Sequence, residues 1–279
     1  MIQFQDVNFH YKKRTPLFKE LNLDIEIGNI YGLLGKNGAG KTSLLKLIGG
    51  LLFPKSGVIN AMGFNPSERF PAFLSDLFFM PEELHIPAMK VSTFAKVYAP
   101  FYPKFSASQF QNYLKDFEIS ADQKLNGLSQ GQKKKAILSF GLATNSRLLV
   151  LDEPTNGLDI PSKSLFRKVI AGAISDEQTC IISTHQVRDM GTLMDPIIIL
   201  DGGKIVFNDS VEAIAEKLHF EVTYSRGEPT DVLYAERVLG GYMVVKENKF
   251  EEETEVDIEI FFNAMMANRA GIQALFQRA

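Results

Sequence analysis

The segment GKNGAGKT, residues 35–42, limits the possible folds of this 279-residue chain more than any other. The apolar run NIYGLL precedes it, and KTSLLKLIGGLL continues from it with helical spacing. A strand that leads through a glycine-rich loop into a helix lets backbone N–H groups surround a phosphate, where larger side chains would block them. The sequence therefore predicts an α/β protein with a phosphate-binding loop.

The end of this loop carries two groups with different chemistry. Lys41 brings a positive charge to the β- and γ-phosphates of a nucleotide, and the hydroxyl group of Thr42 is a suitable Mg²⁺ ligand. ATP and Mg²⁺ are therefore the expected cofactors. The residues expected to surround the phosphates are Gly35, Lys36, Asn37, Gly38, Ala39, Gly40, Lys41, Thr42 and Ser43.

Two carboxylates and a histidine follow buried strands further along the chain. RLLVLDE predicts a central strand that delivers Asp152 to the edge where α/β sheets place ligands, so Asp152 can hold Mg²⁺ through water. Glu153 is placed to act as a general base on an attacking water. IISTHQ places His185 just past another buried strand, within reach of a γ-phosphate. By themselves, these residues also fit a solvated turn at Pro154 and a structural histidine.

The remaining pattern divides the chain into parts. IQFQDVNF and LNLDIEI alternate as strands do, and helices alternate with buried strands after residue 127. Between them lies a stretch rich in proline and aromatic residues with an amphipathic segment that starts at Ser106 or Ser108. We predict one unit over 1–218 with a helical insertion at about 82–127, and a small α+β appendage over 219–279.

The order of these motifs resembles the nucleotide-binding subunit of an ABC transporter. The matching segments are the phosphate loop, LSQGQ (128–132), LLVLDEPTNGLD (148–159) and STH (183–185). The resemblance covers about residues 1–210. It implies a P-loop NTPase cassette with an antiparallel β subdomain and a helical subdomain, which hydrolyses ATP with Glu153, His185 and Lys41 as catalytic residues.

The resemblance also implies a partner. Two cassettes of this family meet head to tail, and the signature of one closes on the ATP held by the other. The residues expected to contact that ATP are Ser129, Gln130, Gly131, Gln132 and, in the D-loop, Asp159. Tyr11 matches the aromatic residue that stacks on adenine, with Phe9 as a neighbouring candidate. A plain serine N-cap is the alternative interpretation of LSQGQ.

Two positions depart from the family pattern. Gln130 stands where Gly is usual, at the less restricted of the two middle positions, so dimer closure is expected to survive. Glu82 stands where a Gln usually coordinates Mg²⁺; a carboxylate should bind the metal at least as well, but it adds negative charge beside Asp152. Glu83 is the alternative match. Sequences with PEE here resemble the branch whose permeases are ABC-2 exporters.

Two other segments have a distinct pattern but match none of these motifs. Lys133–Lys135 cannot all reach one ligand from a helix, so we expect a solvated helix face. An apolar stripe at helical spacing near the C-terminus is expected to pack against the strands of the appendage, with a membrane or dimer contact as alternatives. Its members are Ile258, Phe261, Phe262, Met265 and Met266.

Composition excludes several classes of protein. The net charge of −3 argues against a general nucleic-acid binder, which needs surplus Lys and Arg. The apolar runs are far shorter than the roughly 20 residues that cross a bilayer, and the N-terminus has no signal-peptide pattern. Cys180, in an apolar run, is expected to be a core residue. We therefore expect a cytoplasmic protein that reaches the inner face of the membrane through a permease.

The expected function is an ATPase subunit that dimerises on ATP, most simply as a homodimer, and drives a separate permease, with export as the direction. A soluble ABC ATPase without a transport role is the alternative. A nucleotide-sensing subunit with negligible turnover is a third possibility, disfavoured by the presence of Glu153 and His185.

Overall fold

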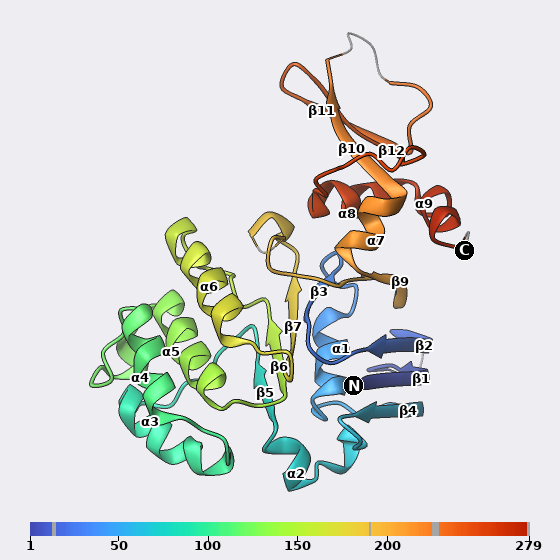
Figure 1. The fold of residues 1–279 in the computed structure, drawn as a ribbon. Coiled ribbons are helices and arrows are strands. Elements are labelled where there is room, and N and C mark those ends of the chain that lie inside the picture. Colours follow the sequence, from blue (N-terminus) through green and yellow to red (C-terminus); the bar gives the residue numbers. More distant parts are fainter. Residues whose placement is uncertain (13–14, 190, 225–228, 278–279) are drawn as a thin grey trace.

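The computed structural model describes residues 1–12, 15–189, 191–224 and 229–277, and the strands of these residues form three sheets (Figure 1). The largest has six strands in the order β5-β6-β7-β3-β8-β9. They are β3 (Ile30–Leu34), β5 (Leu77–Met80), β6 (Leu148–Asp152), β7 (Thr179–Thr184), β8 (Ile197–Asp201) and β9 (Lys204–Asp209). β9 runs antiparallel to β8, whereas β5, β6, β7, β3 and β8 are mutually parallel. The predicted α/β fold is confirmed.

Both faces of this sheet are buried, which explains why its strands are continuous apolar runs. Successive side chains of a strand point to opposite faces, so neighbouring residues join different cores. In β6, Leu148 and Val150 belong to one core, and Leu149 and Leu151 belong to the other. The predicted core residue Cys180 is fully buried in β7.

A three-stranded antiparallel sheet covers the face of the main sheet to which Leu148 and Val150 point. It has the order β2-β1-β4, with β1 (Ile2–Phe9), β2 (Phe18–Ile25) and β4 (Ser56–Ala61). α1 (Lys41–Ile48) shares this core with it (Figure 1). The sequence did not predict β4 or β5. β4 carries a glycine and exposes four of its six residues, and β5 is only four residues long, so neither shows a clear period.

Helices gather on the other side of the sheet (Figure 1). After β5 come α3 (Val91–Tyr98), the short η2 (Ala99–Phe101), α4 (Ala107–Asp116) and η3 (Leu125–Gly127). α5 (Gln130–Ala143) packs against α4 and α6 (Ile160–Ala173). Ser106, one of the two predicted helix starts, is the N-cap of α4, and its hydroxyl oxygen accepts a hydrogen bond from the Gln109 N–H. The limits of the predicted insertion, 82–127, stay a prediction.

α7 (Val211–Lys217) leads directly into the third sheet. This sheet has the order β10-β12-β11, with β10 (Leu218–Thr223), β11 (Tyr234–Val238) and β12 (Gly241–Glu247). The predicted apolar stripe lies on α8 (Ile258–Ala267), and a further helix that the sequence did not predict, α9 (Arg269–Phe276), follows it. Asn268 between them caps α9 by accepting a hydrogen bond from the Gly271 N–H.

The C-terminal helices pack on the main sheet as well as on the third one. The ring of Phe207 in β9 lies 4.8 Å from that of Phe261 and 5.1 Å from that of Phe276, between centroids. The Gln273 amide donates to the Val206 carbonyl oxygen at 2.7 Å. Of the predicted stripe, Ile258, Phe261 and Met265 are buried, and Phe262 and Met266 pack partly buried against the same core. The division of the chain at 218 stays a prediction.

Within the described ranges, the structure contains no helix with the length and apolar character needed to span a bilayer.

Candidate nucleotide site

The glycine loop, β6 and β7 border one cavity of about 490 Å³. It lies where the parallel strands end, which is where α/β sheets place their ligands. The residues that line it are Tyr11, Leu17, Lys36, Asn37, Gly38, Gly40, Lys41, Thr42, Ser43, Glu82, Glu153 and His185. Residues far apart in the sequence are therefore brought together here. Gly35, Ala39 and Asp152 adjoin this lining without being part of it.

The loop backbone adopts a conformation that depends on glycine. Gly38 has φ of 81° and Gly40, the N-cap of α1, has φ of 109°. Both lie in the left-handed region, which L side chains rarely adopt. A Cβ at Gly40 would lie 2.9 Å from the Phe18 ring, so β2 packs directly against the loop. The loop N–H groups and the positive end of α1 form an anion-binding environment.

Lys41 is buried, although it carries a charge. Its Nζ atom donates to the Gly35 carbonyl oxygen at 2.7 Å and lies 3.5 Å from Glu153 Oε1. The ammonium group is thus held across the loop by a carbonyl and a carboxylate. It faces the space in which the phosphates of a nucleotide would bring further negative charge.

Ser183 in β7 joins the two carboxylate residues at the end of β6. Its hydroxyl donates to Asp152 Oδ1 at 2.6 Å and accepts a hydrogen bond from the Glu153 N–H at 2.9 Å. Asp152 is 1% exposed. Sequence reasoning did not single out Ser183, although its place two residues before His185 in the neighbouring strand was a usable signal.

The Glu153 side chain faces His185. Glu153 Oε1 lies 2.9 Å from His185 Nδ1, and Glu153 Oε2 accepts the His185 backbone N–H at 3.4 Å. Glu153 has a φ of 45°, which is unusual for a residue with a Cβ and is found mainly where the surroundings impose it. The two residues predicted to act in catalysis therefore contact each other directly.

Tyr11 and Phe9 have different environments. Tyr11 is 64% exposed, lines the cavity, and shares a hydrogen bond of 2.9 Å between its hydroxyl and that of Ser43. Phe9 is buried, and its ring lies nearly perpendicular to that of Tyr11, with the two centroids 5.0 Å apart. The exposed Tyr11 ring can therefore contact a planar ligand, whereas the buried Phe9 ring packs against Tyr11.

Glu82 lines the cavity, and Glu83 does not. Glu82 Oε1 accepts a hydrogen bond from the Asn156 amide at 3.1 Å. Of the two matches considered from the sequence, Glu82 is the one that borders the cavity, and its role as a metal ligand stays a prediction.

The signature residues lie outside this cavity, at the start of α5. Ser129 is the N-cap: its hydroxyl oxygen accepts the Gln132 N–H at 3.2 Å, and Gln132 Oε1 accepts the Ser129 N–H at 3.0 Å. A Cβ at Gly131 would lie 3.1 Å from the Leu158 side chain, so the signature adjoins the D-loop. Asp159 caps α6 by accepting the Ser162 N–H at 2.9 Å, and hydrogen bonds from the Ser162 hydroxyl group and N–H lower the pKa of its carboxyl group.

One expectation about α5 is wrong. Lys133–Lys135 were predicted to form a solvated face, but Lys134 is only 6% exposed and its Nζ atom donates to the Glu153 carbonyl oxygen at 2.9 Å. The helix turns this residue toward the end of β6, so tertiary packing overrides the preference of lysine for water. Sequence reasoning missed a contact with the predicted general base.

The residues present fit ATP with Mg²⁺. The loop offers N–H groups, Lys41 and an open space at Gly38, where a Cβ would meet nothing within 4 Å. Thr42, Glu82 and Asp152 are the predicted metal residues, and their oxygens are ligands that Mg²⁺ prefers. Within the described residues, no group of three or more His, Cys, Asp or Glu could hold a metal alone. Mg²⁺ commonly shares its coordination between protein oxygens and substrate phosphates.

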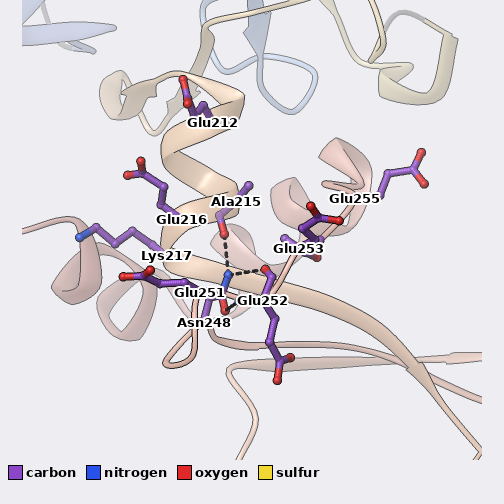
Figure 2. Close-up of a pocket in the computed structure, with 10 residues that line it drawn as sticks. Glu212, Ala215, Glu216, Lys217, Asn248, Glu251, Glu252, Glu253 and Glu255 are labelled. Atoms are coloured by element: carbon purple, nitrogen blue, oxygen red, sulfur yellow. Dashed lines mark hydrogen bonds between the residues drawn. The ribbon is translucent and has the colours of Figure 1, made fainter.

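A larger concavity, of about 1100 Å³, lies between α7 and the segment 248–255 (Figure 2). The Asn248 amide ties this segment together by donating to the carbonyl oxygens of Ala215 and Glu252, each at 2.9 Å. Its charged lining consists of Glu212, Glu216, Lys217, Glu251, Glu252, Glu253 and Glu255. So acidic a surface repels phosphate, which makes the smaller cavity the better candidate for a nucleotide.

Comparison with known proteins decides the family. The family model described as "ABC transporter" matches residues 18–156, which include the glycine loop, the signature and the two carboxylates. The chain belongs to the ABC transporter family. It is an ABC ATPase and an ATP-binding subunit of that family, as the resemblance implied.

Several relatives of this ABC ATPase extend over most of its length. The ABC transporter ATP-binding protein NatA of Bacillus subtilis is 27% identical over 248 residues, which cover 86% of this chain and 96% of NatA. YtrB of the same organism is 30% identical over 195 residues, 68% of this chain and 66% of YtrB. The structure of cbiO1 from Clostridium perfringens, part of the ABC transporter complex cbiONQ, has a TM-score of 0.62 at 25% identity and covers 77% of this chain and 90% of cbiO1.

Proposed function

We propose that this chain hydrolyses ATP in a head-to-tail dimer and thereby drives a separate membrane permease, with export as the direction of transport. The observation that carries the proposal is the separation of two anion-binding elements in one chain. The glycine loop borders the cavity, whereas Ser129 and Gly131 lie outside it at the start of another helix. One protomer therefore presents its signature to a nucleotide that it does not itself hold.

Hydrolysis follows from the contacts around the cavity. Lys41 and the loop N–H groups would hold the phosphates, and Thr42, Glu82 and Asp152 would hold Mg²⁺. When bound, this ion neutralises charge on the phosphate oxygens. Glu153 takes a proton from the attacking water. His185, whose Nδ1 atom lies 2.9 Å from Glu153 Oε1, orients that carboxylate and reaches the γ-phosphate. Tyr11 stacks on the base.

The dimer completes the site. The α5 N-terminus, with its capping box, directs N–H groups and a partial positive charge outward, and a γ-phosphate of a second protomer would satisfy both. Asp159, capping α6 beside the signature, lies at the same surface. Support comes from a solved cassette of the same fold, MJ0796, described as a dimeric post-hydrolysis state bound to ADP and Pi. A second copy of this chain is the simplest partner.

The permease docks on the first part of the helical region. Val97, Tyr98 and Phe101 form an exposed apolar patch at the end of α3 and in η2, and Phe101 is 66% exposed. The segment that contains Glu82 leads into α3, so a change at the γ-phosphate can reach this patch. The protein then sits on the cytoplasmic face of the membrane through its permease and binds no nucleic acid.

Proteins named for import and proteins named for export are similarly related to this chain. A molybdate import protein of Haemophilus influenzae is 29% identical over 216 residues, and a Nod factor export protein of Burkholderia orbicola is 28% identical over 221 residues. Identity therefore does not separate the two directions. The Pro81–Glu82–Glu83 sequence, which resembles the ABC-2 branch, is what favours export.

Docking is tested with Phe101→Asp in cells that express the permease. We expect transport to be lost while the ATPase rate of the isolated protein stays within about twofold of wild type, because Phe101 is exposed and is not among the residues that line the cavity. Leu239→Asp is the matched control, since this apolar side chain is fully exposed on the C-terminal part. Normal transport by Phe101→Asp would refute docking at this patch.

A further inference from the structure

Lys134 is a buried cation outside the set of predicted site residues. It lies in the second turn of α5 and is 6% exposed. Its Nζ atom donates to the Glu153 carbonyl oxygen at 2.9 Å. Lysine is almost never buried unless it is paired, so its surroundings must supply the compensation.

That compensation comes from the acidic residues of the nucleotide site. Burial lowers the pKa of Lys134, and the carboxylates of Glu82, Glu153 and Asp152 act in the opposite direction by favouring its charged form. Lys134 therefore adds a second positive charge to a region where Lys41 lies 3.5 Å from Glu153. Three carboxylates and two ammonium groups surround the end of β6.

The contact with Glu153 falls on a strained part of the backbone. Glu153 has φ of 45°, and a residue with a Cβ holds such a conformation only where its neighbours fix it. On one side, the Glu153 N–H donates to Ser183 Oγ at 2.9 Å; on the other, the Glu153 carbonyl accepts from Lys134. One anchor comes from β7 and the other from α5, the helix that begins with the signature.

We propose that Lys134 is a positioning residue for Glu153, fixing the general base relative to the signature helix and balancing the additional carboxylate of Glu82. The inference rests on the proposed hydrolysis at this site. A neutral apolar side chain at position 134 would leave the Glu153 carbonyl oxygen without this donor and the carboxylates with one positive charge fewer. The carboxylate of Glu82 and the ammonium group of Lys134 are thus two halves of one arrangement.

The first test measures steady-state ATP hydrolysis by Lys134→Met, which keeps the length of the side chain and removes its donor and charge. We expect kcat to fall roughly tenfold to a hundredfold, as small displacements of catalytic groups do, while KM for ATP stays within about threefold. Lys115→Met is the control, because it removes the same charge from a lysine that is exposed on α4. A wild-type kcat for Lys134→Met would overturn the proposal.

The second test needs neither nucleotide nor activity. Thermal midpoints are compared for wild type, Lys134→Met, Glu82→Gln and the double variant. Because Lys134 balances the Glu82 carboxylate, Glu82→Gln should raise the midpoint of Lys134→Met and fail to raise that of wild type. Additive midpoints would overturn the charge balance. Should Lys134→Met not fold, Lys134→Gln replaces it in both tests under the same criteria.

The two tests separate failure of this inference from failure of the proposed function. A wild-type protein without ATPase activity would contradict the proposed function, and the midpoints would still report whether Lys134 and Glu82 are coupled. An active wild type with an unaffected Lys134→Met would contradict the inference alone.

Discussion

Gly131→Ala separates the signature's role in the dimer from its role in the fold. The added Cβ would lie 3.1 Å from Leu158 Cδ2 and 3.7 Å from the Gly157 carbonyl oxygen. The closer of these atoms is the end of a flexible side chain, which can move by a few tenths of an ångström. Alanine also favours a helix over glycine by up to about 1 kcal/mol, so the two effects roughly cancel.

The thermal midpoint of Gly131→Ala should therefore stay within roughly 4 °C of wild type, the shift that about 1 kcal/mol produces in a domain of this size. Its ATPase rate should fall by tenfold or more, because the methyl group occupies the approach to the α5 N-terminus, where the partner's γ-phosphate would bind. The assays are differential scanning fluorimetry and steady-state ATP hydrolysis.

Gly141→Ala is the contrasting substitution on the same helix. Its Cβ would lie 2.1–2.5 Å from three atoms of the Phe78 ring, deep in the core. Overpacking of this kind costs about 1–3 kcal/mol or more, so the midpoint should drop by several degrees. Wild-type ATPase activity in Gly131→Ala, or a midpoint loss as large as that of Gly141→Ala, would refute this reasoning.

Three further predictions follow from single contacts. Tyr11→Ala should raise the dissociation constant for ATP roughly tenfold, the value of one stacking contact, and equilibrium binding of a fluorescent ATP analogue measures it; unchanged affinity would exclude stacking. Ser183→Ala should lower kcat about tenfold or more with little change in KM, because the hydroxyl fixes both Asp152 and the Glu153 backbone; an unchanged kcat would contradict that role. Asp76→Asn should destabilise the protein near neutral pH, as equilibrium urea unfolding would reveal. Burial raises the pKa of the Asp76 carboxyl group, but hydrogen bonds from Arg147 and Lys104 outweigh burial and leave that pKa below 3.8. The carboxylate therefore stabilises the folded protein above pH 3.8, and this stabilisation disappears as the pH falls through the lowered pKa of the folded state. Equal wild-type and variant stabilities at pH 7 would contradict this.

The parts of the fold with strong local signals could be predicted from the sequence. The strands β6, β7 and β8 are continuous apolar runs because helices and a second sheet bury both of their faces. A phosphate-binding glycine loop must connect a strand to a helix, and in the structure this loop connects β3 to α1. For these elements, local propensity and tertiary environment agree.

Other features depend on contacts that a single sequence does not encode locally. Lys133, Lys134 and Lys135 share the same local sequence, so the sequence does not distinguish them. The packing of α5 against the end of β6 decides that Lys134 is the buried one. The break at Asn268 is similar, because the apolar pattern continues through it into α9. The site's residue types could be read from motifs, whereas their mutual contacts required the fold.

The central claim is that ATP joins two copies of this chain through the signature, and the solution mass of Glu153→Gln tests it most directly. Light scattering is recorded with and without saturating Mg²⁺ and ATP, alongside the wild-type ATPase rate against protein concentration. We expect a mutant mass that doubles only with ATP, because the slowed hydrolysis traps the closed dimer, and a wild-type rate that rises faster than linearly. A Glu153→Gln protein that binds ATP and remains monomeric would contradict the homodimer.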